Sequence, residues 1–454
     1  MTEKTIPEIL IPAEKVPVKI TADICVIGGS CTGVFAAVRA ARLGKKVVLL
    51  ERTGKFGGVA TLDFVGIWHS LYDFEGKRQI IGGLTGEVLE QLEKRNARKG
   101  EQNGWSAINT EELTLVLDDL AAAEKNISVL LHTSYLSPVM SDDGRKVQAV
   151  VLFNKSGRFA VRADFFIDAS GDGLLCRDAG VPMWTSQFPQ PPTACCRLAN
   201  AGVLRNAKDL KEMIERNRNE FPDLPGGYSW GMDIPGSSLY MLAGTRVLNC
   251  RCEDADEITR AELESRRQIR AMIDMVRKEA PDSNLSLQGL PSEIGIREGL
   301  HIQSLARAEG DALLFRLTPA EETIGCGTYP VDIHHTDSDR IEFFQLSGIH
   351  DVYRSHVLET RSRWLPEGET LSYYRIPMKA MIPVKIENLI AAGRMIDADR
   401  KAFGALRVMV NLNQCGEAAG VAASLCLDRG RAAQKTDIAE VRAELNRGGS
   451  LLPD

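Results

Sequence analysis

The sequence of 454 residues lacks both a long apolar run and an excess of positive charge. No stretch approaches the roughly 20 consecutive apolar residues that a membrane-spanning helix requires. The formal net charge is −6, whereas a protein that neutralises nucleic-acid phosphates needs a basic surface. We therefore expect no membrane insertion and no nucleic-acid partner, and a small-molecule ligand is the better match.

Cysteines are few, and their spacing does not suit metal binding. The chain has ten of them, with no Cys-x-x-Cys pair. Iron–sulfur and structural zinc sites depend on such pairs, and a disulfide scaffold needs a much higher cysteine density. We therefore predict that the protein has no metal site.

The N-terminus also lacks the features of an export signal. Residues 1–8 contain two glutamates and a proline, where a signal peptide would have basic residues followed by an apolar core. On this basis we expect a cytoplasmic protein.

What the sequence does have is a nucleotide-binding pattern close to its N-terminus. Residues 23–33 have the pattern of a strand that ends in a glycine-containing turn, and an alanine-rich helix pattern follows as far as Gly44. A second apolar strand, residues 46–50, ends at the acidic residue Glu51. This order of strand, turn, helix, strand and acid is typical of a unit that binds the ADP half of a dinucleotide.

Each part of this pattern has a physical role. Gly28 and Gly33 would let the backbone approach the pyrophosphate, and Glu51 would bind the ribose hydroxyls. Ser30 occupies the place of the middle glycine, where its hydroxyl could donate to a phosphate oxygen. The alternative is a βαβ unit that binds no nucleotide.

A glycine-rich loop follows the acidic residue directly. Residues 52–61 contain Gly54, Gly57 and Gly58, which are too close together for regular structure. We expect the loop to press backbone amides against the same dinucleotide, with a plain surface turn as the alternative.

The rest of the chain alternates between helix and strand patterns. Residues 164–173 repeat the design of a buried strand followed by glycines. Amphipathic helices are predicted over residues 84–98 and 110–124, and a short strand over 129–133. A hairpin or meander is predicted over residues 146–163.

The C-terminal part also has the pattern of a ligand site. Residues 388–394 have the pattern of a buried strand that ends in Gly393 and Arg394, and residues 403–409 lead into a small-residue helix. Two ligand-like segments more than 300 residues apart indicate one long cofactor that both ends contact. FAD has the required length.

With these segments in place, the chain resembles the FAD-dependent oxidoreductases that have a glutathione-reductase-type Rossmann domain. It is distantly similar to the flavoprotein subunits of fumarate reductase and succinate dehydrogenase. The resemblance rests on the order and spacing of several short motifs. They are the N-terminal fingerprint, residues 57–61, 168–172, 294–298, 327–334, 374–377, 392–394 and 404–409.

The resemblance implies an α/β fold with two parts. A Rossmann-like FAD-binding domain, with a three-stranded β-meander beside its sheet, would comprise residues 1–185 and 381–454. An α+β substrate or cap domain would be inserted at residues 186–380.

The resemblance also implies which residues bind FAD. Those expected at the pyrophosphate, ribose and ribityl chain are Gly28, Ser30, Gly33, Glu51, Arg52, Gly57, Gly58, Thr61, Arg394 and Asp399. Tyr135, Ala169, Ser170 and Gly171 are expected on the adenosine side, and Gly404, Ala405, Leu406 and Arg407 at the N1/C2 edge of the flavin.

Four residues in family-like motifs of the second part are candidates for catalysis. Arg297 could anchor a carboxylate or stabilise an enolate, and His334 could move a proton near neutral pH. His301 and Lys379 stand where relatives commonly have arginines, which indicates a different way of anchoring the substrate. The alternatives are a structural ion pair of Arg297 with Glu298 and histidines that only support loops.

The predicted activity is hydride transfer between a small polar metabolite and N5 of a flavin. The alternatives are a flavin-dependent monooxygenase and a flavoprotein subunit of an electron-transfer complex. Residues 174–380 contain no second dinucleotide fingerprint, so we expect an external electron donor or acceptor. FAD is expected to bind non-covalently, with a link through His69 as the less favoured alternative. A homodimer is the commonest oligomer and is the default expectation.

Overall fold

The computed structural model describes residues 9–100, 104–226, 229–355 and 357–453. Residues 1–8, on which the expectation about export rests, lie outside this part. A seven-stranded sheet forms the centre of the fold, in the order β6-β2-β1-β9-β8-β7, with β22 also paired to β9. Its strands are β1 (Val18–Ile27), β2 (Val47–Leu50), β6 (Ile127–Leu130), β7 (Ser134–Met140), β8 (Val147–Asn154), β9 (Gly157–Asp168) and β22 (Leu389–Ala391).

Five of these strands run parallel, and their carboxyl ends meet at one edge of the sheet. Ile27 pairs with Leu50 on one side and with Asp168 on the other, and Ala391 pairs with Asp168 as well. A loop that follows any of these strands therefore begins at the same edge. This is where open α/β sheets bind their ligands.

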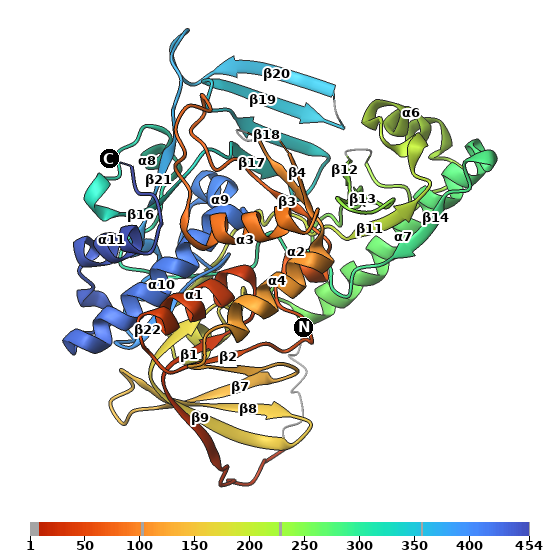
Figure 1. Ribbon diagram of the computed structural model, residues 1–454. Coiled ribbons are helices and arrows are strands. Elements are labelled where there is room, and N and C mark those ends of the chain that lie inside the picture. Colours follow the sequence, from red (N-terminus) through yellow and green to blue (C-terminus); the bar gives the residue numbers. More distant parts are fainter. Residues whose placement is uncertain (1–8, 101–103, 227–228, 356, 454) are drawn as a thin grey trace, which may run out of the picture.

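Strand β9 is longer than the sequence pattern suggests. Residues 158–163 and 164–168 were expected as two separate strands, but they form one strand. Its first half pairs antiparallel with β8, and its second half pairs parallel with β22. One strand thus joins the three-stranded meander of β7, β8 and β9, seen at the bottom of Figure 1, to the parallel sheet.

Helices cover the parallel strands, and shorter ones support the loops. The helices are α1 (Cys31–Arg42), α2 (Val59–Leu62), α3 (Gly83–Lys94), α4 (Thr110–Ala122), α5 (Leu174–Asp178), α6 (Ala207–Asn217), α7 (Ala255–Glu279), α8 (Gly310–Leu314), α9 (Arg400–Leu406), α10 (Met409–Arg429) and α11 (Ile438–Arg447). None of the helices among the described residues is long and apolar enough to cross a membrane.

Helices α1 and α10 lie against each other, although one is near the start of the chain and the other near its end (Figure 1). Gly416 and Gly420 of α10 make this close approach possible. A Cβ atom at Gly416 would lie 2.2 Å from the carbonyl oxygen of Thr32, and one at Gly420 would lie 2.2 Å from that of Ala36. Only glycine leaves room for the α1 backbone at these two positions.

The segment between β9 and β22 folds into smaller sheets. One has the order β12-β13-β11-β14 and packs with α6 and α7, and another has the order β17-β18-β19-β20. Figure 1 shows the first toward the right and the second at the top. The strands are β10 (Met183–Thr185), β11 (Cys195–Ala199), β12 (Trp230–Asp233), β13 (Tyr240–Ala243), β14 (Ser286–Gly289), β15 (Leu300–Ile302), β16 (Thr323–Gly327), β17 (Val331–His334), β18 (Arg340–Phe344), β19 (Ile349–Arg354), β20 (Val357–Arg363) and β21 (Tyr374–Pro377). Strands β3 (Ile67–Trp68), β4 (Arg98–Gly100) and β5 (Ser106–Ile108) form a further sheet.

Candidate functional site

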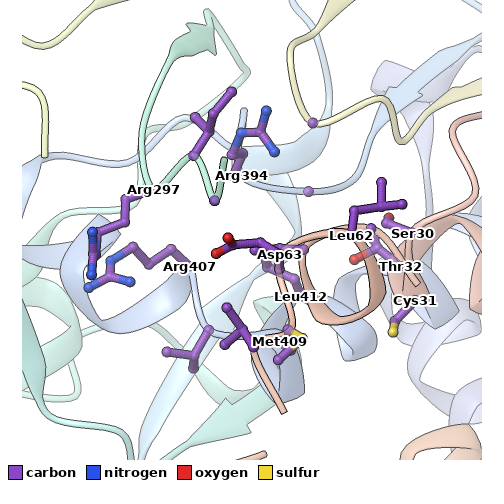
Figure 2. Close-up of a pocket in the computed structure, with 18 of the residues that line it drawn as sticks. Ser30, Cys31, Thr32, Leu62, Asp63, Arg297, Arg394, Arg407, Met409 and Leu412 are labelled. Carbon is purple, nitrogen blue, oxygen red and sulfur yellow. The ribbon is translucent and has the colours of Figure 1, made fainter. Parts of the chain in front are cut away.

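A cavity of about 430 Å³ opens at the carboxyl ends of the parallel strands. Ligand sites of proteins commonly have volumes of roughly 300–1,000 Å³. Residues from both ends of the chain and from its middle line the cavity (Figure 2). Among the sequence-predicted residues, the lining includes Gly28, Ser30, Glu51, Arg52, Gly57, Gly58, Ala169, Ser170, Gly171, Arg297, His334, Arg394 and Arg407.

The N-terminal fingerprint forms one end of this cavity. Gly28 has a φ of +103°, and a Cβ atom there would lie 2.4 Å from the carbonyl oxygen of Ala169, so the turn requires glycine. Ser30 caps helix α1, and its hydroxyl accepts a hydrogen bond from the amide of Gly33 at 3.4 Å. Gly33 lies beneath the turn rather than on the cavity wall. The serine at the middle position is therefore compatible with the turn.

Glu51 braces the same turn from the end of β2. Its Oε2 accepts a hydrogen bond from the amide of Gly29 at 2.8 Å, and its Oε1 accepts one from the amide of Thr53 at 2.8 Å. The carboxylate is largely buried and lines the cavity. Each carboxylate oxygen has a second lone pair, so both could still accept from a ribose hydroxyl.

The glycine loop after Glu51 is anchored to the fingerprint turn. Gly57 has a φ of +112° and donates its amide to the carbonyl of Gly29 at 2.8 Å. Thr61 lies behind the loop, where its hydroxyl donates to the carbonyl of Phe56 at 2.7 Å. Arg52 lines the cavity and forms an ion pair with Glu293.

The loop after β9 forms a second wall. The buried Asp168 accepts from the hydroxyl of Ser170 at 2.7 Å and from the amide of Cys176 at 3.0 Å, which fixes the turn between them. Gly171 lies against Arg394, since a Cβ atom at Gly171 would be 2.6 Å from the Nη1 atom of that arginine. Arg394 itself is paired with Asp172.

The C-terminal wall is formed by the start of α10. Arg407, Val408, Met409, Leu412 and Asn413 line the cavity. The sequence-predicted Gly404, Ala405 and Leu406 belong to helix α9 and do not reach the cavity. Asp399 caps α9 by accepting from the amide of Ala402 at 2.8 Å, and Tyr135 on β7 also lies away from the cavity. These five residues do not line the cavity, and their contact with FAD stays a prediction.

A cluster of polar side chains lies at the other end of the cavity. Asp332 accepts a hydrogen bond from Arg407 at 2.8 Å and one from the hydroxyl of Tyr329 at 2.6 Å, and it lies 3.2 Å from Nε2 of His334. Burial acts to raise the pKa of Asp332, but His334 and Arg407 outweigh it and hold the pKa well below its usual range. The carboxylate is therefore ionised. Both of its hydrogen bonds reach Oδ2, and Oδ1 faces Nε2 of His334.

His334 is held in one tautomer by its neighbours. Arg246 donates to Nδ1 at 2.9 Å, so Nδ1 must carry the lone pair, and Nε2 then carries the proton that faces Asp332. Burial lowers the pKa of His334 to about 3. The imidazole is thus neutral at physiological pH, which does not suit the predicted proton transfer near neutral pH.

Arg297 also lines this end of the cavity, but it has no ionic partner among the described residues. Its Nη1 donates at 2.6 Å to the carbonyl of Pro191 and at 2.6 Å to the hydroxyl of Thr193. Glu298, the partner in the alternative interpretation, accepts instead from the amide of Gln190 at 2.9 Å and from His301. No ion pair between Arg297 and Glu298 forms.

The other two catalytic candidates lie elsewhere. His301 is completely buried, stacks on Trp184 with ring centroids 4.4 Å apart, and bonds to the carbonyl of Ile396 at 2.8 Å. Lys379 forms an ion pair with Glu322 at 2.6 Å. Neither residue lines the cavity, so the structure does not bring them to Arg297 and His334.

Sequence reasoning missed Asp63, whose carboxyl group points into the cavity in Figure 2. Its Oδ1 accepts from the amide of Cys195 at 3.0 Å. Burial raises the pKa of Asp63 well above its usual value. The available signal was its position two residues after Thr61, at the end of the glycine loop and helix α2. A buried carboxyl of this kind can hold a proton for transfer.

His69 reaches the cavity from strand β3, and its ring centroid lies 4.1 Å from that of Tyr329. Burial lowers the pKa of His69 to about 4, so the ring is neutral at physiological pH. Among the described residues, no cluster of three or more histidine, cysteine or acidic side chains is placed to hold a metal ion.

The parallel sheet, the fingerprint turn and the cavity at the strand ends define a dinucleotide-binding protein with a Rossmann-like fold. The model of the FAD dependent oxidoreductase family matches residues 23–445, nearly the whole chain. The protein therefore belongs to the FAD dependent oxidoreductase family, and FAD is its cofactor.

The chain is also similar to solved structures, all at low sequence identity. A geranylgeranyl bacteriochlorophyll reductase-like protein from Thermoplasma acidophilum is 12% identical, over 94% of this chain and 82% of that one, with a TM-score of 0.46. A triple mutant of the flavin-dependent brominase Bmp2 is 12% identical, over 94% and 84%, with a TM-score of 0.45. The p-nitrophenol 4-monooxygenase from Pseudomonas putida is 13% identical, over 63% and 71%, with a TM-score of 0.40. A search of the curated proteins finds no significant match.

The lining of the cavity suits FAD in its exposed backbone groups and in its unsatisfied polar side chains. The start of α1 and the loop at Gly57 and Gly58 present backbone to it, as phosphates require. The side-chain amide of Asn413 is buried in its wall, and neither Oδ1 nor Nδ2 has a hydrogen-bond partner among the described residues. Buried polar atoms without partners are rare, and a ligand that offers both a donor and an acceptor would satisfy them.

Proposed function

We propose that this FAD-dependent oxidoreductase transfers a hydride between a small polar metabolite and N5 of the flavin. The supporting observation is the continuity of the cavity, which extends from the fingerprint at Gly28 to the polar group around Arg297 and His334. When bound, FAD supplies the two-electron redox chemistry, and the protein supplies orientation, charge and proton handling.

The fingerprint end and the polar end of the cavity have different roles in this proposal. The cavity-lining residues at the fingerprint, glycine loop, β9 turn and start of α10 would contact FAD. Gly33, Thr61, Tyr135, Asp399 and Gly404 to Leu406 would support these contacts from behind. Residues 186–380 would form the substrate domain between the two segments of the FAD-binding domain.

The side chains at the polar end would bind and orient the substrate. Asp332 holds the Arg407 side chain at 2.8 Å, and Arg246 fixes the tautomer of His334. Asp63 would hold or deliver the proton that accompanies the hydride, because its buried carboxyl has a raised pKa and faces the cavity. His301 and Lys379 have no direct role in this proposal.

The electron partner would be external to the chain. In the part of the chain that the structure describes, strands β10 to β21 pair with one another only in antiparallel fashion. A built-in nicotinamide domain would need parallel βαβ units there. This supports an exchange of electrons with the substrate and with a separate donor or acceptor.

Anaerobic mixing of the holoenzyme with panels of small alcohols, hydroxy acids and amino acids tests the proposal. A substrate should bleach the flavin absorbance without oxygen, and its product should lack two hydrogens. A substrate deuterated at the reacting carbon should bleach the flavin more slowly. In a separate reaction under isotopically heavy oxygen gas, the appearance of one heavy oxygen atom in the product would indicate a monooxygenase instead. Bleaching only by a protein electron donor would indicate an electron-transfer subunit.

A further inference from the structure

The guanidinium group of Arg297 carries a positive charge that the protein does not neutralise. Its Nη1 is held at 2.6 Å by two neutral oxygens, the carbonyl of Pro191 and the hydroxyl of Thr193. No carboxylate among the described residues lies within ion-pair distance of it. Arg297 is one of the residues that line the cavity.

The carboxylates around Arg297 form no ion pair with it. Asp332 accepts from Arg407 and from Tyr329, and Glu298 accepts from the amide of Gln190. Asp63 also lines the cavity, but it forms no ion pair with Arg297. The charge of Arg297 therefore has no ion-pair partner among the described residues.

Arg297 keeps its charge in spite of these surroundings. Burial, followed by repulsion from Arg407 and Arg246, lowers the pKa of Arg297 to about 10. The group is thus still protonated at neutral pH. Figure 2 shows Arg297 and Arg407 at the same end of the cavity. A half-buried guanidinium without a counter-ion is unfavourable, so this arrangement is suited to an anionic ligand.

We propose that the substrate of this enzyme carries a carboxylate group, which Arg297 binds at the polar end of the cavity. This inference rests on the proposed function, because it names the class of the metabolite that faces the flavin. The planar guanidinium fork matches the two oxygens of a carboxylate. The charges also match: Arg297 carries one positive charge and a carboxylate one negative charge, whereas a phosphate ester carries nearly two.

The two hydrogen bonds from Nη1 fix the orientation of the Arg297 guanidinium. Because Nη1 donates to Pro191 and Thr193, Nη2 and Nε remain for the ligand. A lysine at this position would keep the charge but lose the fork, so it should bind a carboxylate less well than arginine does.

Calorimetric titration at constant ionic strength tests this proposal on the holoenzyme, with acetate, acetamide and inorganic phosphate as probes. Acetamide has nearly the shape of acetate without its charge. We expect acetate to bind at least about tenfold more tightly than acetamide or phosphate. The variant R297M should lose at least about tenfold in acetate affinity, and R297K should fall between the two. R267M is the matched control, because Arg267 is exposed on α7, and it should bind acetate like the wild type.

Equal binding of acetate and acetamide by the wild type would overturn the proposal, and so would unchanged acetate binding by R297M. Stronger binding of phosphate that R297M abolishes would replace the carboxylate with a phosphate ester. If R297M does not fold, the comparison of acetate with acetamide on the wild type still tests the proposal. Flavin content is measured in the same samples, so that a failure of acetate binding can be distinguished from a failure of the proposed function. A protein that binds acetate through Arg297 but is never reduced by a small molecule would keep the anion site and lose the proposed reaction.

Discussion

Arg39 on α1 and Glu417 on α10 form a buried ion pair in which Nε lies 2.7 Å from Oε2. The two residues are 378 positions apart in the sequence. The pair lies beside the close contact of α1 with Gly416 and Gly420. Glu417 also accepts from the amide of Leu84 at 3.2 Å, so the start of α3 joins the same network. The two halves of the FAD site are therefore held together by charge as well as by packing.

Replacing Glu417 with Gln should destabilise the protein strongly, because it leaves Arg39 charged, buried and unpaired. Removal of one partner of a buried pair costs about 3–5 kcal/mol. Urea denaturation of the holoenzyme measures the change. E87Q is the control, since Glu87 pairs with Arg42 at the surface and should lose at most about 1 kcal/mol. Similar losses in both variants would contradict the structural role of the buried pair.

Replacing Gly420 with Ala should separate α1 from α10, since the added Cβ would lie 2.2 Å from the carbonyl oxygen of Ala36. Overpacking of this kind costs about 1–3 kcal/mol. G86A is the matched control, because Gly86 lies in α3 with nothing within 4 Å of an added Cβ, and alanine favours a helix. We expect G420A to lower the melting temperature and the FAD content, and G86A to lower neither. Normal FAD content in G420A would show that the contact is not required for the site.

Replacing Glu51 with Ala should weaken FAD binding, because the ribose would lose its acceptor and the amide of Gly29 would lose its partner. A hydrogen bond to a charged group is worth about 1.5–3 kcal/mol, or roughly ten- to a hundredfold in dissociation constant. Fluorescence titration of the apoprotein with FAD measures this change. E14A, which alters an exposed glutamate, should bind like the wild type. Equal affinity of E51A and E14A would mean that the ribose lies elsewhere.

Replacing Asp63 with Asn should slow the reaction without loss of FAD. The amide oxygen can still accept from the amide of Cys195, but the side chain no longer titrates. Proton transfer by a positioned group typically contributes about 10²- to 10⁴-fold to the rate. In the wild type, reduction of the substrate should slow as the pH rises through the raised pKa of Asp63, because the carboxyl loses the proton that it donates. Rapid-reaction kinetics across pH should show this decline only in the wild type, and identical profiles would exclude Asp63 from proton transfer.

Acid should destabilise the protein through His69. Burial lowers its pKa from 6.5 to about 4, so the unfolded chain binds more protons than the folded one between these pH values. Stability should fall as the pH drops through this window, by at most about 1.4 kcal/mol per pH unit. The variant H69F lacks this titration, so urea denaturation with FAD in fixed excess should show a shallower decline for it. Parallel curves for the two proteins would contradict the lowered pKa.

Local patterns in the sequence predicted the parts of the fold that depend on neighbouring residues. Gly28, Glu51 and the glycines at 57 and 58 all line the cavity, because their roles follow from one short βα unit and the loop after it. At the start of α10 the cavity is lined by Arg407 to Met409, whereas Gly404 to Leu406 belong to α9. The short helix α9 ends at Leu406, and this boundary has no clear signal in the sequence.

The polar end of the cavity could not be worked out in the same way. It is assembled from Asp63, Thr193, Arg297 and Asp332, which come from four distant segments. A sequence motif shows that a residue such as His301 has charged neighbours, but not that its ring is packed against Trp184. Contacts between distant segments decide which charged groups meet and which are neutralised.

The visible spectrum of the purified protein shows whether both ends of the chain build one FAD site. We expect flavin absorbance in the native protein, either as purified or after addition of FAD. We also expect all of the flavin to be released on denaturation, since we predict no covalent link through His69. A colourless protein that takes up no added FAD would mean that the two ends of the chain do not form an FAD site.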